Sequence, residues 1–375
     1  MSWLEKMTLR WSPGLFGGVT LPQWWAILRE NRFSVDLPYW PQAAIITASS
    51  LFNSAAALCE NVCYRRRIEQ TTIEPPIFVL GVWRSGTTLL QNLLCVDRRF
   101  GYANYFQVFY PSTFLATEAF LPKILGLFLP KSRLQDNVFV SPSEAAEDEV
   151  ATALLTHQSM LLSWVFFRNQ AFYDRLLTYR NATAGEIADW QAALQLFMKK
   201  LTLKQRRPLV LKSPGHTGRI RLLLEMFPEA KFVHIHRNPY TVYQSSEHTF
   251  RLAASFMALQ RPNFENAQER NLRQYAELCE AFFEERDLIP AGNLHEVRFE
   301  DLEADPLAEM AKLYEALDLP KFAEVRDDLA AYVEGLKGYQ RNRFPELPEA
   351  LRTRIAREWQ RSFEEWGYDP VGVPS

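Results

Sequence analysis

A short glycine-containing stretch carries the residue types of an anion-binding loop. The sequence IFVLGVWRSGTTLL, residues 77–90, leads from four apolar residues into a turn with two glycines. The members of the turn that can contact an anion, through side chain or backbone, are Arg84, Ser85, Gly86, Thr87 and Thr88. A glycine-rich turn between a strand and a helix points several backbone N–H groups at one place, where the helix dipole adds positive potential. The stretch therefore predicts a site for one phosphate-like group, unless its glycines serve only a tight turn.

The same stretch departs from a Walker A loop at one informative position. The glycine spacing fits the pattern G-x-x-x-x-G-K-[ST], but Thr87 stands where that pattern has lysine. A Walker lysine reaches the β- and γ-phosphates of a triphosphate, with Mg²⁺ on the hydroxyl that follows. Without it, a donor with no γ-phosphate and no obligatory metal is favoured, and Arg84 supplies a cation inside the loop.

A second group of anion-binding residue types follows a later strand. In KFVHIHRNPYTVYQSS, residues 231–246, Arg237 comes directly after the strand and Ser245 lies in the helix that follows Pro239. A loop arginine can fold over to meet a helix serine, so the pair predicts a second phosphate site. The alternative is that Arg237 only ends the strand and that the serine is exposed.

The elements that must position these residues indicate an α/β fold with a P-loop-like parallel sheet flanked by helices. Short β-branched runs alternate with helical patterns after Pro75-Pro76. Strands are predicted at residues 77–80, 209–211, 232–236 and 294–299. Buried strands separated by helices imply a parallel sheet that is covered on both faces.

Two further regions complete the predicted organisation. Residues 1–70 form a helical N-terminal region, and residues 71–375 form the main domain. Between the first two strands lies a long helical insertion, about residues 100–205, rich in Phe, Tyr, Leu and Trp. Ligands of parallel sheets bind beyond the carboxyl ends of the strands, so this insertion is expected to wall an acceptor pocket. The alternative is a helical subdomain with its own core.

Composition excludes several classes of function. The chain has 375 residues, 47% of them hydrophobic, and a net charge of -2. This balance gives no general attraction to nucleic acid, so a phosphorylated ligand must be held by local arginines, lysines and amides. The four cysteines form no CxxC pair, which favours reduced cytoplasmic thiols over a disulfide scaffold or a structural zinc site.

One segment raises the question of membrane contact. PQAAIITASSLFNSAAALC, residues 41–59, has no charged residue and is followed by Arg65-Arg66-Arg67. Its length is close to a bilayer span, but its serines, asparagine and alanines make it only moderately apolar. We expect a core-packed helix of a soluble protein, with a true span as the alternative and peripheral membrane contact between the two.

Several segments together resemble the sulfotransferase family. GVWRSGTTLL looks like that family's 5′-phosphosulfate loop, and VHIHRNPYTVYQSS looks like its 3′-phosphate motif, an arginine followed eight positions later by a serine. LVLKSPGHTGRIRLLLEMFPEAKFVHIHRNP, residues 209–239, and VRFEDLEADPLAEMAKLYEALDLP, residues 297–320, match two further family segments. The resemblance covers roughly residues 75–320 in the family's order.

The resemblance implies a donor and a reaction. The donor is 3′-phosphoadenosine 5′-phosphosulfate, whose sulfuryl group passes in line to a hydroxyl or amine of the acceptor, and no metal is expected. Arg84, Lys212 and the loop amides would stabilise charge on the sulfuryl oxygens and the departing phosphate. Arg237 and Ser245 would hold the 3′-phosphate. The family usually has lysine where this chain has Arg84, and its adenine-stacking tryptophan is replaced by Leu89.

The general base is the least determined role. The cytosolic branch of the family has histidine where this chain has Pro214, and we favour His216 because it shares a loop with Lys212. A carboxylate from SPSEAAEDEV, residues 141–150, is the alternative because the protein-tyrosine branch is thought to use glutamate. Its candidates are Glu147, Asp148 and Glu149. Glu144 is expected instead to cap a helix together with Ser141.

Two other functions compete with sulfuryl transfer. A nucleotide kinase with a degenerate loop would need another lysine and Mg²⁺ ligands, and Arg237 and Ser245 would have no role in it. A non-catalytic phosphoadenosine-binding protein would not need Lys212. The apolar insertion favours a hydrophobic small-molecule or lipid acceptor. A basic segment, residues 337–344, is a further candidate for closing over the 3′-phosphate. The sequence indicates no oligomeric state.

Overall fold

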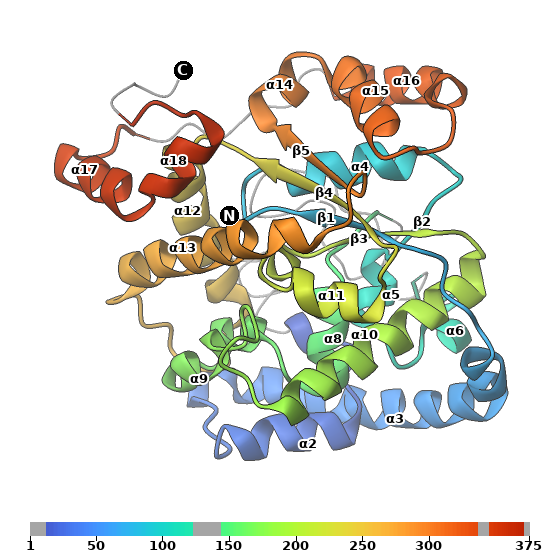
Figure 1. Cartoon of the computed structure of the whole chain (residues 1–375). Coiled ribbons are helices and arrows are strands. Elements are labelled where there is room, and N and C mark those ends of the chain that lie inside the picture. Colours follow the sequence, from blue (N-terminus) through green and yellow to red (C-terminus); the bar gives the residue numbers. More distant parts are fainter. Residues whose placement is uncertain (1–12, 123–143, 337–344, 371–375) are drawn as a thin grey trace. The chain divides into compact units, whose positions relative to one another are not determined.

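The computed structural model describes residues 13–122, 144–336 and 345–370. The chain divides into two compact units (Figure 1). The helical unit comprises Met1–Ile73, Tyr102–Arg206 and Phe250–Phe264, and the sheet unit comprises Glu74–Gly101, Arg207–Thr249 and Glu265–Ser375. The helical N-terminal region and most of the insertion expected from the sequence thus fall in the same unit.

The sheet has five strands in the order β2-β3-β1-β4-β5. They are β1 (Ile77–Leu80), β2 (Gly101–Tyr102), β3 (Leu209–Lys212), β4 (Lys231–His236) and β5 (Leu294–Arg298). β1 pairs in parallel with β3 and with β4, and β4 pairs in parallel with β5. The chain passes from β3 on one side of β1 to β4 on the other, so the connections diverge at the carboxyl end of β1. The predicted strands and the α/β fold are confirmed.

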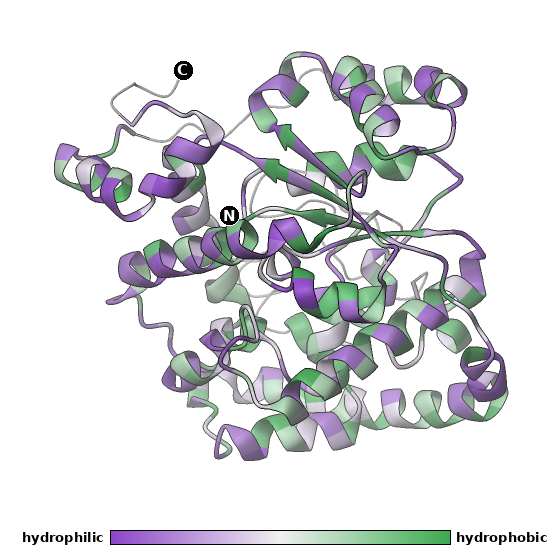
Figure 2. Cartoon of the chain, viewed as in Figure 1, coloured by the Kyte–Doolittle hydropathy of each residue, from purple (hydrophilic) through white to green (hydrophobic). Residues whose placement is uncertain are grey.

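Helices cover both faces of this sheet (Figure 1). One set of helices follows strands β1, β3, β4 and β5 along the chain. They are α4 (Thr87–Val96), α11 (Ile220–Met226), α12 (Pro239–Met257), α13 (Ala267–Glu285), α14 (Phe299–Ala304), α15 (Pro306–Ala316), α16 (Arg326–Gly335), α17 (Glu349–Glu358) and α18 (Gln360–Trp366). Short 3₁₀ turns are η5 (Pro214–Gly218), η6 (Arg286–Leu288) and η7 (Phe322–Glu324). Figure 2 shows the hydrophobic colouring of the strands between these layers.

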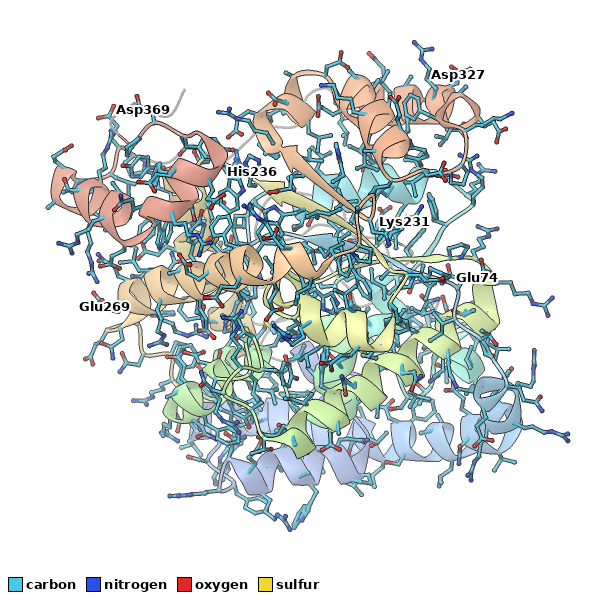
Figure 3. All side chains as sticks on the ribbon, in the orientation of Figure 1. Glu74, Lys231, His236, Glu269, Asp327 and Asp369 are labelled. Atoms are coloured by element: carbon cyan, nitrogen blue, oxygen red, sulfur yellow. The ribbon has the colours of Figure 1, made fainter. Side chains whose placement is uncertain are left out.

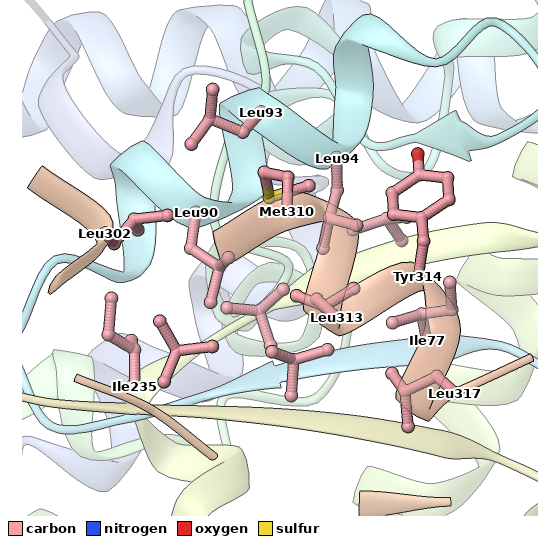
Figure 4. Close-up of a cluster of buried hydrophobic side chains, with 14 of the residues drawn as sticks. Ile77, Leu90, Leu93, Leu94, Ile235, Leu302, Met310, Leu313, Tyr314 and Leu317 are labelled. Carbon is pink, nitrogen blue, oxygen red and sulfur yellow. The ribbon is translucent and has the colours of Figure 1, made fainter. Parts of the chain in front are cut away.

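A hydrophobic core of the sheet unit lies on one face of the sheet. Alternate strand residues such as Ile77, Val79 and Val233 point to this face. They pack against leucines of α4 and against residues of α14, α15 and α16 (Figure 4). The intervening residue Phe78 points to the other face, where its ring stacks on that of Phe232 at 5.7 Å. Burial of both faces explains why the strands read as continuous apolar runs.

The helical unit is built from the N-terminal helices and the insertion. Its helices are α2 (Leu21–Glu30), α3 (Trp40–Glu69), α5 (Tyr105–Phe109), α6 (Phe114–Thr117), α8 (Glu149–Thr156), α9 (Gln170–Asp174) and α10 (Ala184–Gln205). Its 3₁₀ turns are η1 (Gly14–Phe16), η2 (Leu37–Tyr39), η3 (Met160–Trp164) and η4 (Phe167–Asn169). The longer helices α2 and α3 contact each other, and α10 contacts α3 and α8.

Local sequence explains the start of the long helix α10 and its packing. Thr183 and Glu186 form a reciprocal capping box, which satisfies backbone N–H groups that have no partner within the helix. Trp190 is fully buried and packs on Tyr179 at 5.1 Å between ring centroids.

The predicted cap at Glu144 is not formed, because Glu144 lies in a bend and α8 begins only at Glu149. Ser141 lies outside the described residues, as does the basic segment 337–344.

One helix among the described residues is long and apolar enough to cross a membrane by length and composition. It runs from Leu37 to Glu69 and includes α3, and only 22% of its most apolar window is buried. The segment is therefore a surface helix rather than the core-packed helix expected from its composition.

Candidate active site

The loop between β1 and α4 is held in shape by its two glycines. Gly81 has φ of 142°, and its N–H donates to Thr217 Oγ1 at 2.8 Å. Gly86 has φ of 107° and directly precedes α4. A side chain at Gly86 would collide with the Phe299 ring, since its Cβ would lie 2.3 Å from Phe299 Cδ2. These conformations favour glycine and turn the chain sharply into the N-terminus of α4.

The predicted loop residues have different surroundings. Ser85 is fully buried, and its Oγ donates to the Val82 carbonyl at 2.9 Å, so this hydroxyl stabilises the turn. Thr87 and Thr88 form the first turn of α4, where backbone N–H groups have no partner within the helix. Arg84 has φ of 72°, a left-handed conformation that is uncommon for a residue with a side chain.

Arg84 joins this loop to the second predicted phosphate site. Its Nε donates to Ser245 Oγ at 2.8 Å across 161 positions of sequence. Ser246 Oγ donates to the Trp83 carbonyl at 3.3 Å, so α12 contacts the loop at two points. Arg237 lies beside them, with Nη1 donating to the Arg84 carbonyl at 3.4 Å. The two anion-binding segments predicted from sequence therefore meet at one edge of the sheet.

Ser245 has a partner that sequence reasoning did not name. The sequence suggested that Arg237 would fold over to Ser245, and the structure shows Arg84 donating a hydrogen bond to it. The Arg237 guanidinium lies over the ring of Phe299 at 4.0 Å. Sequence reasoning did not single out Phe299, although its position directly after β5 places it at the same carboxyl edge. Phe299 thus contacts Arg237 and closely faces Gly86 of the loop.

Lys212 approaches the loop from the neighbouring strand. It is the last residue of β3 and is almost fully buried, and its Nζ lies 3.5 Å from Thr88 Oγ1. Strand pairing explains this approach, because β3 runs parallel to β1 and ends at the same edge. The structure thus brings Lys212 to the first turn of α4.

His216 lies on the other side of the sheet from that contact. It sits in η5, is fully buried, and packs edge-on against Phe78 with 5.3 Å between ring centroids. Phe78 alternates with Ile77 and Val79, whose side chains face α4. The His216 ring thus packs on Phe78, whereas Lys212 approaches Thr88.

The alternative base candidates belong to the helical unit. Asp148 and Glu149 are buried, and Glu147 is half-buried. Glu149 Oε1 accepts a hydrogen bond from Ser159 Oγ at 2.6 Å, which links the start of α8 to η3. This contact gives Glu149 a structural role of its own.

Histidines beneath Arg237 support the end of β4. His236, at the carboxyl end of β4 (Figure 3), stacks on Trp366 with 4.9 Å between ring centroids. Burial and the neighbouring His234 lower the pKa of His236 to about 3, so this imidazole is neutral at neutral pH. Burial alone would raise the pKa of Glu296, but hydrogen bonds with His234 and Trp366 help lower it to about 2. His234 and His236 are therefore strand histidines with aromatic and polar partners.

No metal site is formed by the acidic, histidine and cysteine side chains within residues 13–122, 144–336 and 345–370. In these ranges, no group of three or more His, Cys, Asp and Glu side chains could hold an ion. The described site is instead an arrangement of arginines, a lysine, hydroxyls and backbone amides at the edge of a parallel sheet. Such a set suits tetrahedral anionic groups.

The fold and this site are those of a protein that binds phosphate-like groups at the edge of a parallel sheet, and comparison identifies its family. The sulfotransferase family's sequence profile matches residues 75–324. The chain belongs to the sulfotransferase family, and it is an enzyme that transfers sulfuryl groups. The predicted resemblance is confirmed, and the kinase and non-catalytic alternatives are not supported.

A curated relative matches nearly the whole chain. It is the omega-hydroxy-beta-dihydromenaquinone-9 sulfotransferase Stf3, found in Mycobacterium bovis and Mycobacterium tuberculosis. Each of the two is 32% identical over 360 residues, which is 96% of this chain and 92% of the relative. The match extends beyond the family profile and includes the N-terminal helices.

Two solved structures share the fold. Sulfotransferase STF9 from Mycobacterium avium aligns with a TM-score of 0.68 and 17% identity, over 95% of this chain and 98% of that one. Sulfotransferase STF1 from Mycobacterium tuberculosis H37Rv aligns with a TM-score of 0.61 and 18% identity, over 83% of this chain and 86% of that one. At these identities the likeness concerns the fold alone.

Proposed function

We propose that this sulfotransferase takes its sulfuryl group from 3′-phosphoadenosine 5′-phosphosulfate and passes it to a hydroxyl of a hydrophobic, lipid-like acceptor. The observation that carries the donor proposal is the 2.8 Å hydrogen bond from Arg84 Nε to Ser245 Oγ. It brings the β1–α4 loop and the segment after β4 together at one edge of the sheet. A donor with a 5′-phosphosulfate and a separate 3′-phosphate needs two adjacent anion sites of this kind.

The residues at this edge fit such a donor. The loop amides, Thr87 and Thr88 at the N-terminus of α4 suit the 5′-phosphate, because helix N-termini favour anions. Arg237 and Ser245 suit the 3′-phosphate, since a guanidinium and a hydroxyl both donate to phosphate oxygens. Lys212, close to Thr88, adds a cation beside the loop.

For the transfer step, we assign electrostatic stabilisation to Lys212 and Arg84. As the acceptor oxygen attacks the sulfur in line, the bond from sulfur to the bridging phosphate oxygen breaks, and negative charge grows on that phosphate. A fixed lysine and a fixed arginine interact more strongly with this charge in the transition state than with the donor in its ground state. The acceptor's proton passes to a base, and sulfated acceptor and adenosine 3′,5′-bisphosphate are the products.

His216 is our proposed base, with Glu147, Asp148 and Glu149 as the alternative group. Its ring packs against Phe78, so a role in the core competes with a role in proton transfer. His216→Asn separates the two roles. A base role predicts a fall in kcat of about 10²- to 10⁴-fold with unchanged donor affinity and melting temperature. A core role predicts a lower melting temperature with little change in the kcat of the folded enzyme. In that case Glu147→Gln is the next variant to assay.

The acceptor proposal is supported by the relative's name and by composition. The relative acts on an omega-hydroxy menaquinone derivative, which is a hydroxyl on an apolar lipid. The insertion of this chain is rich in aromatic and aliphatic residues, which suits an apolar ligand. We expect long-chain alcohols and hydroxylated polyprenyl quinones to consume donor, with a sulfate added to the acceptor by mass spectrometry. Turnover confined to charged saccharides would contradict this acceptor class.

The cysteines support a cytoplasmic location. Cys59, Cys63, Cys95 and Cys279 form no disulfide, and reduced thiols are typical of the cytoplasm. We therefore propose that the reaction takes place on the cytoplasmic side of the cell.

Calorimetry with two nucleotides tests the donor site. We expect adenosine 3′,5′-bisphosphate to bind more tightly than adenosine 5′-monophosphate, because only the former contacts Arg237 and Ser245. Arg237→Gln should reduce this preference by about 10- to 100-fold, because the variant loses charged hydrogen bonds to the 3′-phosphate. Arg207→Gln is the matched control, since Arg207 is exposed and precedes β3 at the opposite edge. An Arg237 variant that keeps the full preference would exclude this assignment of the 3′-phosphate.

A further inference from the structure

The helix α3 in the helical unit has an inverted distribution of polarity. Its buried positions are Gln42, Ile46, Ser50, Asn53, Glu60 and Ile68, most of which are polar. Its exposed positions include large apolar side chains, namely Trp40 at 60%, Leu51 at 57%, Phe52 at 51%, Leu58 at 68% and Val62 at 85% exposure. A surface helix of a soluble protein normally buries its apolar side. This helix therefore keeps its most hydrophobic side in contact with the surroundings.

Specific polar contacts fix α3 in this orientation. Asn53 Nδ2 donates to the Gly17 and Val19 carbonyls at 2.8 and 3.0 Å. Glu60 forms a buried ion pair with Lys200 and accepts a hydrogen bond from the Ala116 N–H at 3.0 Å. Rotating α3 to bury its apolar side would leave these groups without partners, at a cost of several kcal/mol. The exposure is thus built into the packing of the unit.

The exposed apolar residues of α3 form one continuous stripe. Trp40, Ala44, Ala48, Leu51, Ala55, Leu58 and Val62 follow each other at intervals of three or four residues, so they share a face of the helix. No charged residue occurs from Leu37 to Cys59. Because the buried contacts at Asn53 and Glu60 hold α3 along its length, the helix cannot surround itself with lipid as a span would. It can only lie flat with the stripe outward.

Exposed aromatic side chains also occur at α2, the helix that packs against α3. Trp25 is 59% exposed and packs edge-on against Phe33, which is 50% exposed, at 5.1 Å. Arg32 and Phe33 both adopt positive φ, 54° and 53°, in the turn that ends α2. Two consecutive residues with side chains in this conformation are strained, and such strain persists only where the surrounding structure enforces it. The turn holds Phe33 outward beside Trp25.

Exposed arginines adjoin this apolar region in the sequence. Arg65, Arg66 and Arg67 are exposed in the last turns of α3, and Figure 2 shows this end of α3 in hydrophilic colours. Glu69 pairs with Arg65 at 2.8 Å and so neutralises one of the three. Arg32 is exposed next to Phe33. Net positive charge therefore flanks the stripe.

We propose that the outer face of α2 and α3 binds the surface of an anionic phospholipid bilayer. This outer face consists of Trp25, Phe33, Trp40, Leu51, Phe52, Leu58 and Val62, with Arg32, Arg66 and Arg67 beside it. The apolar side chains enter the boundary of head groups and acyl chains, tryptophan suits that boundary, and the arginines contact lipid phosphates. The proposal does not depend on which acceptor the enzyme uses.

The charge distribution favours a bilayer over a second copy of the chain as the occupant. The arginines cluster at one end of α3 beyond the apolar stripe, and the face carries no acidic cluster to meet them. Glu69, at the end of the same helix, already pairs with Arg65. An anionic lipid surface supplies negative charge along its whole extent and so meets the arginines wherever the stripe inserts.

Vesicle sedimentation of the full-length protein tests the proposal. We expect the wild type to sediment with vesicles of phosphatidylcholine mixed with phosphatidylglycerol, and less with phosphatidylcholine alone. Leu51→Glu with Phe52→Glu should weaken partitioning at least about tenfold, because two apolar contacts are replaced by charges that oppose anionic lipid. The matched control is Leu196→Glu with Leu288→Glu, which adds the same charges at leucines 41% and 43% exposed elsewhere. This control should sediment like the wild type.

Two further measurements complete the test. Arg66→Gln with Arg67→Gln should lose the preference for anionic vesicles, and added salt should weaken wild-type binding to them. All variants should keep their melting temperature and their affinity for adenosine 3′,5′-bisphosphate, because none touches the donor site. The proposal is overturned if the wild type stays in the supernatant, or if Leu51→Glu with Phe52→Glu sediments as well as the control. It is equally overturned if that variant only dissociates a dimer.

Discussion

Replacing Gly86 by alanine should destabilise the sheet unit through two separable effects. Gly86 has φ of 107° and ψ of 8° at the start of α4. A Cβ there would lie 2.3 Å from Phe299 Cδ2, 2.9 Å from Phe299 Cε2 and 3.2 Å from Ile235 Cδ1. Phe299 is nearly buried, so its ring cannot turn away without moving the core around it.

The two effects have comparable magnitudes. An alanine held in this region of backbone conformation costs about 1–3 kcal/mol. Inserting a methyl group into a packed contact costs about 1–3 kcal/mol more. We therefore expect Gly86→Ala to lower the free energy of unfolding by about 2–6 kcal/mol, a large part of the 5–15 kcal/mol typical of a folded domain. Because Phe299 also contacts Arg237, affinity for adenosine 3′,5′-bisphosphate should fall as well.

Gly292→Ala isolates the backbone effect. Gly292 has φ of 85°, and a Cβ there would meet nothing within 4 Å. Urea unfolding of both variants should show Gly86→Ala as the less stable by the steric contribution, about 1–3 kcal/mol. Adding Phe299→Leu to Gly86→Ala should recover part of that difference. If Gly86→Ala and Gly292→Ala unfold with free energies within about 0.5 kcal/mol of each other, the loop does not press on Phe299 as described.

Other predictions concern pH and a buried ion pair. As the pH falls from 6.5 to 3, the free energy of unfolding should decrease by at most about 1.4 kcal/mol per pH unit. The reason is that His236 stays neutral in the folded protein but takes up a proton near its ordinary pKa in the unfolded chain. Below pH 4.5 the lowered pKa of Glu296 adds to this loss. Urea titrations at several pH values measure both effects, and His236→Gln should flatten the slope above pH 4.5. Lys200→Met should cost about 3–5 kcal/mol, since Glu60 would remain buried without its cation. Glu60→Gln added to Lys200→Met should recover part of that cost, and a neutral single variant would contradict the pairing.

Much of the sheet unit follows from local sequence. Strands covered on both faces read as continuous apolar runs, so Ile77–Leu80 and Leu209–Lys212 were predictable nearly to the residue. The turn between β1 and α4 was also predictable, because its glycines and hydroxyls occur in one short stretch. These features depend on neighbours in sequence, which the pattern of residue types records directly.

The partners within the site were less predictable because they depend on distant contacts. Ser245 accepts from Arg84, 161 positions away, and sequence spacing alone pointed to Arg237. His216 is near Lys212 in sequence, yet the turn at η5 directs its ring to Phe78 on the other face of the sheet. The exposure of α3 was hidden for a similar reason. Buried polar partners such as Asn53 are recognisable only once Gly17 and Val19 lie beside them.

The hydrogen bond between Arg84 and Ser245 joins the β1–α4 loop to the segment proposed to hold the 3′-phosphate, a group that takes no part in the transfer itself. On the proposed donor, both phosphates belong to the part of the molecule that remains after transfer. Arg237 and Ser245 would therefore hold the spent nucleotide as firmly as the fresh donor. Binding energy that is equal before and after chemistry raises affinity without lowering the barrier. Tight contacts at such a site would slow the departure of product, and we expect turnover to depend on how readily α12 and the loop release it.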